Sequence, residues 1–152
     1  MDGWIKNGKV RGRITEDGAL EVRCFGLTTQ TRYYKQLFRE FFRKDFQRLR
    51  PGYGDFDVHI IMEYTGDAPW MDLDNLAKAL LDSLTGNAFE DDHQVARLLV
   101  ERRVGDREGI YMRVAEMSWE LSRPQARIAS IIGRILRPFS VNRYSERGGC
   151  VS

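Results

Sequence analysis

The sequence predicts an α+β domain, because segments with helical and strand periodicity follow one another in the order helix, strand, helix, strand, strand between residues 31 and 117. At 152 residues the chain is long enough to bury one hydrophobic core without disulfides or a structural metal. We therefore expect one folded domain over residues 1–117. A basic helical extension with a mobile tail is expected over residues 118–152.

The N-terminal segment predicts a β-hairpin. Val10–Ile14 and Leu20–Phe25 are short pieces of strand-forming composition, and the Asp17-Gly18 dipeptide between them suits a tight turn.

The next segment predicts an amphipathic helix that starts near Thr31 and ends before Pro51. Its apolar residues recur at helical spacing, and a second face carries four cations. The apolar set is Tyr34, Leu37, Phe38 and Phe41, and the basic set is Arg32, Lys35, Arg39 and Arg43.

The remaining elements follow from the same two periodicities. Apolar and polar residues alternate from Phe56 to Tyr64, which is typical of a half-buried strand. A leucine-rich stripe then predicts a helix that stops at Gly86-Asn87. Two strands, Val95–Val104 and Ile110–Met117, are expected on either side of a turn at Gly105-Asp106. Between Ser122 and Pro138 an isoleucine face opposite several arginines predicts the basic C-terminal helix.

The composition excludes a membrane-spanning protein. The chain is 42% hydrophobic and 30% charged with a net charge of +2, and it has no apolar run of the roughly 18 residues that a span requires. The first residues do not resemble a secretory signal, and Cys24 and Cys150 lack metal-like spacing. We expect a soluble cytoplasmic protein with two free thiols.

Acidic residues gather around the second predicted helix. Between residues 67 and 92 the chain has seven acids and one cation, Lys78; the acids are Asp67, Asp72, Asp74, Asp82, Glu90, Asp91 and Asp92. Carboxylates crowded in this way repel one another, so a bound cation is expected to offset them. Magnesium prefers such oxygen ligands, and it can activate water for phosphodiester hydrolysis. Asp72, Asp74 and one of Asp91 or Asp92 are the candidate ligands.

A purely structural interpretation of the same residues stays open. Asp74 and Lys78 could form a surface helix pair, Asp72 could cap the helix, and Asp91-Asp92 could form a turn.

The spacing of Asp72-Leu73-Asp74-Asn75-Leu76, Lys78, Asp82, Leu84 and Asp91-Asp92 with Gln94-Val95 closely resembles that of the RusA family of Holliday-junction-resolving endonucleases. A looser resemblance runs from about residue 31 to residue 117. It implies a small mixed sheet packed with helices, in a protein of bacterial or phage origin.

The resemblance further implies a homodimer that cuts four-way DNA junctions with Mg²⁺ or Mn²⁺. Carried over by position, Asp72, Asp74 and Asp92 are the metal ligands and Lys78 is the essential lysine. Asp91 is a further candidate ligand ranked behind Asp92, and Asp82 is expected to have a structural or supporting role.

DNA binding requires basic surface beside an acidic centre. Arg32, Lys35, Arg39 and Arg43 are the candidate contacts, and Tyr33 could add another. Trp70, in the loop before Asp72, could wedge into an opened junction or pack beneath its loop.

Two other functions fit the sequence. One is a branched-DNA-binding protein that does not cleave, and the other is a nuclease that acts on flaps or forks.

Overall fold

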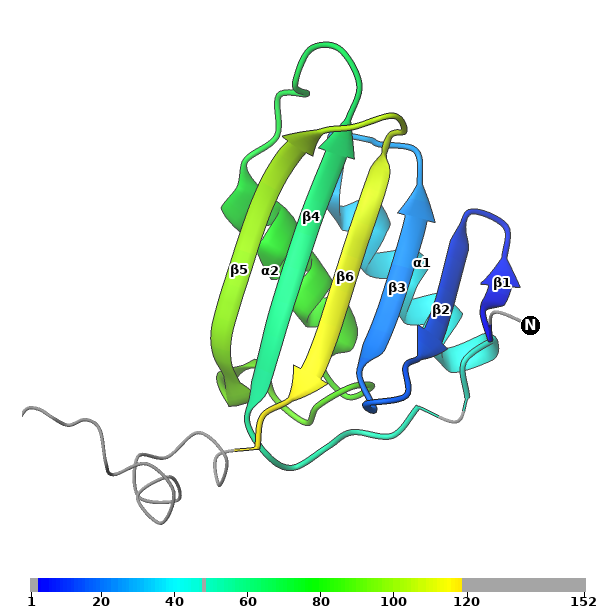
Figure 1. The fold of residues 1–152 in the computed structure, drawn as a ribbon, viewed down its shortest axis with the longest axis vertical. Coiled ribbons are helices and arrows are strands. Elements are labelled where there is room, and N and C mark those ends of the chain that lie inside the picture. Colours follow the sequence, from blue (N-terminus) through cyan, green and yellow to red (C-terminus); the bar gives the residue numbers. More distant parts are fainter. Residues whose placement is uncertain (1–2, 48, 119–152) are drawn as a thin grey trace, which may run out of the picture. The chain divides into compact units, whose positions relative to one another are not determined.

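A computed structural model describes residues 3–47 and 49–118 of the chain. Its elements are β1 (Ile5–Asn7), β2 (Val10–Ile14), β3 (Leu20–Phe25), α1 (Thr31–Lys44), β4 (Phe56–Tyr64), α2 (Leu73–Leu84), the short 3-10 helix η1 (Asp92–Gln94), β5 (Val95–Val104) and β6 (Gly109–Glu116). The strands form a six-stranded sheet in the order β1-β2-β3-β6-β4-β5 (Figure 1). The predicted α+β class is therefore confirmed.

The sheet is mixed. β4 and β5 are parallel and are connected through α2, whereas the other neighbouring strands are antiparallel. The predicted N-terminal hairpin is confirmed as β2 and β3, with Gly18 at a positive φ of 84° in its turn. The sequence did not predict β1, which pairs with the outer edge of β2.

The turn between the last two strands is also confirmed, but these strands do not pair with each other. β4 lies between them, so the connection over residues 105–108 passes across the end of β4. There the Gly105 amide donates to the Tyr64 carbonyl at 2.9 Å. A Cβ atom on Gly105 would lie 1.6 Å from a carboxylate oxygen of Glu63, so a larger residue there would require the Glu63 side chain to move.

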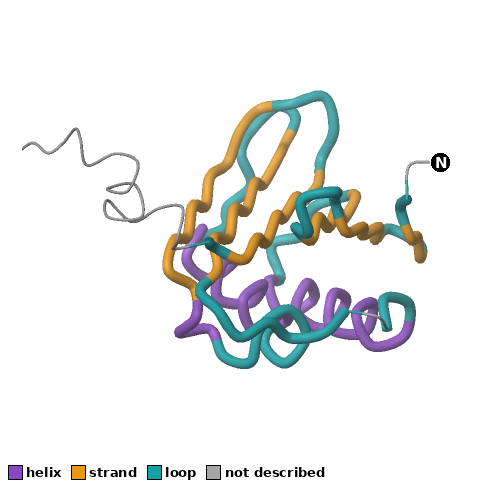
Figure 2. The backbone as a smooth tube through the Cα atoms, turned by 60° about the horizontal axis from the view of Figure 1, so that its bottom comes forward, coloured by secondary structure: helices purple, strands orange, loops and turns teal. Residues whose placement is uncertain are grey.

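Both α-helices pack on one face of the sheet and form the second layer of the domain (Figure 2). The core between these layers includes fully buried side chains from both α-helices and the inner strands, such as Phe38, Ile60, Met62, Leu80 and Met112. No helix among residues 3–47 and 49–118 covers the opposite face, on which Figure 1 looks. That face is called the open face below.

Cys24 is a free, buried thiol, as expected. Burial raises its pKa to about 11, so the thiol stays protonated and unreactive at neutral pH. The predicted C-terminal helix and Cys150 lie outside the described residues. In the part of the chain that the structure describes, no helix is long and apolar enough to span a membrane.

Candidate functional site

Asp72 and Asp74 lie at the start of α2 with exposed side chains. Asp72 occupies the N-cap position, but its carboxylate accepts no capping hydrogen bond from the helix backbone. Its only hydrogen-bond contact given by the structure is from the Asn75 amide at 3.4 Å. The capping interpretation of the Asp72 side chain is therefore wrong, and this carboxylate is free to face a ligand. The positive end of the helix dipole favours negative charge there.

Asp74 and Lys78 are one helical turn apart, yet no ion pair joins them within the described residues. The surface-pair interpretation is therefore also wrong. Instead both residues line a groove of about 390 Å³ between α2 and β5, and Asp92 lines the same groove. Its floor is apolar, from Leu73, Ala77, Leu81, Leu98 and Val100.

The second acidic pair is divided between two roles. Asp91 caps η1, because its carboxylate accepts from the His93 backbone amide at 3.0 Å. Hydrogen bonds from the His93 backbone amide and then from the His93 side chain hold the pKa of Asp91 below its ordinary value. Asp92 is exposed and makes no such cap, which favours Asp92 as the candidate ligand.

Gln94 fixes the position of this acidic pair, and sequence reasoning missed that role. Its buried side-chain oxygen accepts from the amides of Glu90 and Asp91 at 2.8 and 3.0 Å. Its nitrogen donates to the carbonyls of Gly52 and Gly54 at 3.0 and 2.9 Å. The polar groups of the amide are thus fully used, and η1 is held against the loop before β4. A Gln two residues after an acidic pair was the only sequence signal.

The acids are distributed along the groove rather than gathered at one point. α2 begins after the end of β4 and finishes before β5 begins, so Asp74 and Asp92 lie toward opposite ends of the helix (Figure 1). The 12 residues of α2 make it roughly 18 Å long at about 1.5 Å per residue. Among residues 3–47 and 49–118, no three acidic, histidine or cysteine side chains are grouped to hold a metal ion.

The basic face of α1 divides into two pairs. Lys35 forms an ion pair with Asp82 at 3.1 Å, and Arg39 donates to the Asp82 carbonyl at 3.0 Å. These contacts join α1 to the last turn of α2, where helix carbonyls lack partners within their own helix. Asp82 thus has the structural role expected of it. Arg32 and Arg43 are exposed and remain the better candidates for DNA contact on this helix.

Trp70 is 94% exposed, so its ring does not pack beneath the loop in one chain. Of the two interpretations made from the sequence, packing is wrong, and the wedge remains a prediction. Tyr33 is also partly exposed, with Lys9 over its ring at 5.8 Å.

The two histidines have local partners. His59 is hydrogen-bonded to Glu101 at 2.8 Å on the open face, and His93 pairs with Asp91 at 3.0 Å. Neither belongs to a metal-holding group among the described residues.

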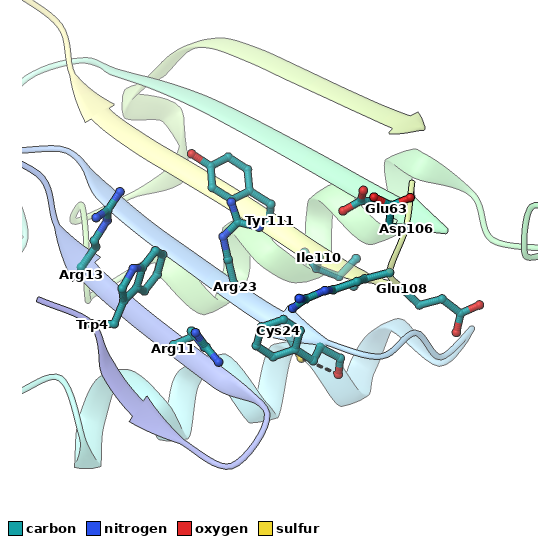
Figure 3. A pocket seen from close by; sticks show the side chains of 13 residues that line it. Trp4, Arg11, Arg13, Arg23, Cys24, Glu63, Asp106, Glu108, Ile110 and Tyr111 are labelled. Carbon is teal, nitrogen blue, oxygen red and sulfur yellow. Dashed lines mark hydrogen bonds between the residues drawn. The ribbon is translucent and has the colours of Figure 1, made fainter. Parts of the chain in front are cut away.

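A cavity of about 530 Å³ lies on the open face, over β2, β3 and β6 (Figure 3). Arginines dominate one end of it, and three of them stack on aromatic rings: Arg13 on Trp4 at 4.7 Å, Arg11 on Phe25 at 4.7 Å and Arg23 on Tyr111 at 4.8 Å. Sequence reasoning did not select these arginines. The alternation of Arg11 and Arg13 along one strand was the available signal.

A two-layer α+β domain with exposed helix-start aspartates, a groove lysine and basic surface is consistent with a nuclease. Comparison with protein families gives the particular class: the family model of the RusA endodeoxyribonucleases matches residues 7–115. The chain therefore belongs to the RusA family of endodeoxyribonucleases, which act on Holliday junctions. No curated protein matches the chain significantly.

Proposed function

We propose that this protein is a divalent-metal-dependent endonuclease that resolves four-way DNA junctions by phosphodiester hydrolysis. The observation that carries the proposal is the exposed carboxylate pair of Asp72 and Asp74, whose side chains make no capping hydrogen bond and no ion pair within the described residues, in a chain of the RusA family.

Asp72, Asp74 and Asp92 are the proposed metal ligands. Carboxylate oxygens fit Mg²⁺ or Mn²⁺, and Mg²⁺ is commonly held by only one or two carboxylates together with water and substrate phosphate. When bound, the ion would lower the pKa of water and stabilise charge on the phosphoryl group. In the hydrolysis, the water oxygen bonds to phosphorus, one bond between phosphorus and a sugar oxygen breaks, and a proton from the water passes through solvent to the departing sugar oxygen.

Lys78 is proposed to contact the scissile phosphate. Its side chain is exposed in the groove, without an ion pair to any described residue. An ammonium in that position can neutralise phosphate charge and draw the DNA backbone toward the acids, which would otherwise repel it.

A homodimer is the proposed assembly. β5 is an edge strand whose Leu98 and Leu99 are 43% and 50% exposed, and an apolar groove lies beside it. Long, exposed edge strands pair readily with other chains, and a two-fold axis is the commonest oligomer symmetry. An axis through the middle of the groove would bring the Asp92 end of each chain to the Asp74 end of the other. Two such sites would suit the two strands that a junction resolvase cuts.

The first test incubates the purified protein with a synthetic four-way junction and Mg²⁺ or Mn²⁺. Cleavage by the wild type, and its loss in Asp74→Asn, is expected. Asp67→Asn is the matched control, because Asp67 is an exposed acid in the loop before α2. Equal cleavage by Asp74→Asn and wild type would reject the assignment. Fork, flap and duplex substrates in the same gel measure the preference for junctions.

A second test examines the shared site by mixing Asp74→Asn with Asp92→Asn subunits. If the ligands come from two chains, each mixed dimer contains one site with both substitutions and one intact site. Cleavage and Mn²⁺ binding should then return in the mixture. If mass spectrometry shows mixed dimers and neither activity nor binding returns, the ligands come from one chain.

A further inference from the structure

The open face carries two adjacent rows of side chains, one in which the charges are paired and one in which they are not. In one row, running across β2, β3 and β6, the register aligns Arg13, Glu21 and Arg113. Charges alternate along this row. Arg13 pairs with Glu21 at 2.8 Å, and Arg113 pairs with Asp17 at 2.7 Å. The row is electrostatically satisfied by the protein itself.

The next row is not satisfied in this way. The same register places Arg11 directly opposite Arg23, and Arg23 directly opposite Tyr111. Like charges that face each other across neighbouring strands destabilise a sheet. Neither Arg11 nor Arg23 forms an ion pair with any residue that the structure describes. The fold therefore keeps two arginines at directly opposed positions without a carboxylate partner for either.

Aromatic rings fix the positions of these two arginines. The guanidinium carbon of Arg11 lies 4.7 Å from the Phe25 ring centre, and that of Arg23 lies 4.8 Å from the Tyr111 ring centre. Stacking occupies one flat face of a guanidinium and leaves its N–H edge available to bind phosphate in a two-pronged geometry. Less side-chain freedom is then lost when an anion binds.

The cavity that contains these groups has a direction. Arg11, Arg13 and Arg23 lie toward the β1–β3 end, whereas Glu63, Asp106 and Glu108 lie toward the turn between β5 and β6 (Figure 3). Arg107 in that turn also lines the cavity, so the turn end carries three acids and one arginine. An extended polyanion would bind along the arginine end and be excluded from the acidic end. The groove between α2 and β5 that contains Asp74, Lys78 and Asp92 is on the helical side of the sheet, so it is separate from the cavity on the open face.

We propose that the Arg11–Arg23 row is a second DNA-binding site, which holds a phosphodiester backbone away from the catalytic groove. This inference rests on the proposed function, because it takes branched DNA to be the substrate of the protein. A junction has four arms, and an arm that is not being cut can be held by such a surface. Phosphate contacts of this kind position DNA without reading its sequence.

The test measures duplex and four-way-junction binding by fluorescence anisotropy in EDTA, over a series of salt concentrations, so cleavage does not enter. The variant is Arg11→Gln with Arg23→Gln. Each lost phosphate contact should reduce the slope of log affinity against log salt by about 0.9, or roughly 1.8 for both. The melting temperature should change little, because the substitution removes both the opposition of like charges and the stacking on the Phe25 and Tyr111 rings.

The matched control is Arg97→Gln with Arg103→Gln. These arginines also lie on the open face but are paired, with Asp57 at 2.5 Å and Glu101 at 3.3 Å. The control should keep most of the wild-type slope. An unchanged slope in the Arg11/Arg23 variant, or an equal fall in the control, would overturn the proposal.

The outcomes separate this proposal from the proposed function. If the wild type cleaves junctions and the Arg11/Arg23 variant keeps its salt slope, only the second site is rejected. If the Arg11/Arg23 substitution lowers DNA affinity but the wild type cleaves no substrate with any metal, the catalytic function is rejected and the binding site stands.

Discussion

Replacing Gln94 with Leu should both destabilise the domain and disturb the acidic pair. The substitution removes four hydrogen bonds, to the amides of Glu90 and Asp91 and to the carbonyls of Gly52 and Gly54, at a position only 9% exposed. A typical bond contributes about 0.5–1.5 kcal/mol net, and some of the freed groups regain water at the surface. We therefore expect a loss of about 2–4 kcal/mol in the free energy of unfolding.

Thermal unfolding followed by circular dichroism measures this loss. For a folded unit of this size, about 1 kcal/mol corresponds to roughly 4 °C, so the melting temperature should fall by about 8–16 °C. Gln36→Leu is the matched control, because Gln36 is exposed on α1 with no hydrogen bond among the described contacts, and it should shift the transition little.

Activity provides the second measurement for Gln94→Leu. Below the transition temperature of the variant, junction cleavage should still fall, since Asp92 is no longer held against the loop before β4. A melting temperature within about 2 °C of the wild type would refute the hydrogen-bond reasoning. Full cleavage by a destabilised variant would instead show that junction cleavage does not depend on the hydrogen bonds that hold η1 in place.

Three further predictions follow from individual contacts. Arg39→Ala should lower the free energy of unfolding by about 1 kcal/mol with little change in DNA affinity, because it removes a hydrogen bond to the Asp82 carbonyl. Arg43→Ala, at an exposed position, should leave the free energy of unfolding unchanged and weaken DNA binding. Denaturant unfolding and DNA-binding measurements on both variants test this. Burial acts to raise the pKa of Glu21, but hydrogen bonds from arginine and tyrosine outweigh it and lower this pKa, so the carboxylate stabilises the fold above pH 4.5 and loses this effect as pH falls through the lowered value. Glu21→Gln should therefore flatten the acid limb of stability against pH, and an unchanged limb would contradict the assignment. Trp70→Ala should leave the melting temperature unchanged, because the ring is 94% exposed, while weakening junction binding more than duplex binding; equal effects on both DNAs would reject the wedge.

Local elements were predictable because their signals are local. The alternation in β4 and the apolar stripe of α2 depend on neighbours a few residues away, and both elements lie where the sequence predicts them. Strand order is different, since pairing joins distant segments. Nothing in the turn near Gly105 indicates that β4 separates β5 from β6.

The candidate site was predictable in its residue types and not in its geometry. Spacing alone cannot distinguish an aspartate whose side chain caps a helix from one whose side chain does not. In the structure the Asp91 side chain caps η1, whereas the Asp72 side chain does not cap α2. Likewise, the Arg11–Arg23 opposition depends on the register between β2 and β3, which the hairpin turn fixes in three dimensions.

The most direct test of junction resolution uses a supercoiled plasmid that extrudes a cruciform, incubated with the protein and Mg²⁺. Two coordinated cuts across the junction convert the circle to a linear product, whereas one cut gives a nicked circle that loses its cruciform. We predict linear plasmid with the wild type and none with Asp74→Asn. Nicked circles as the sole product, or linear product that forms equally with Asp74→Asn, would contradict the proposed function.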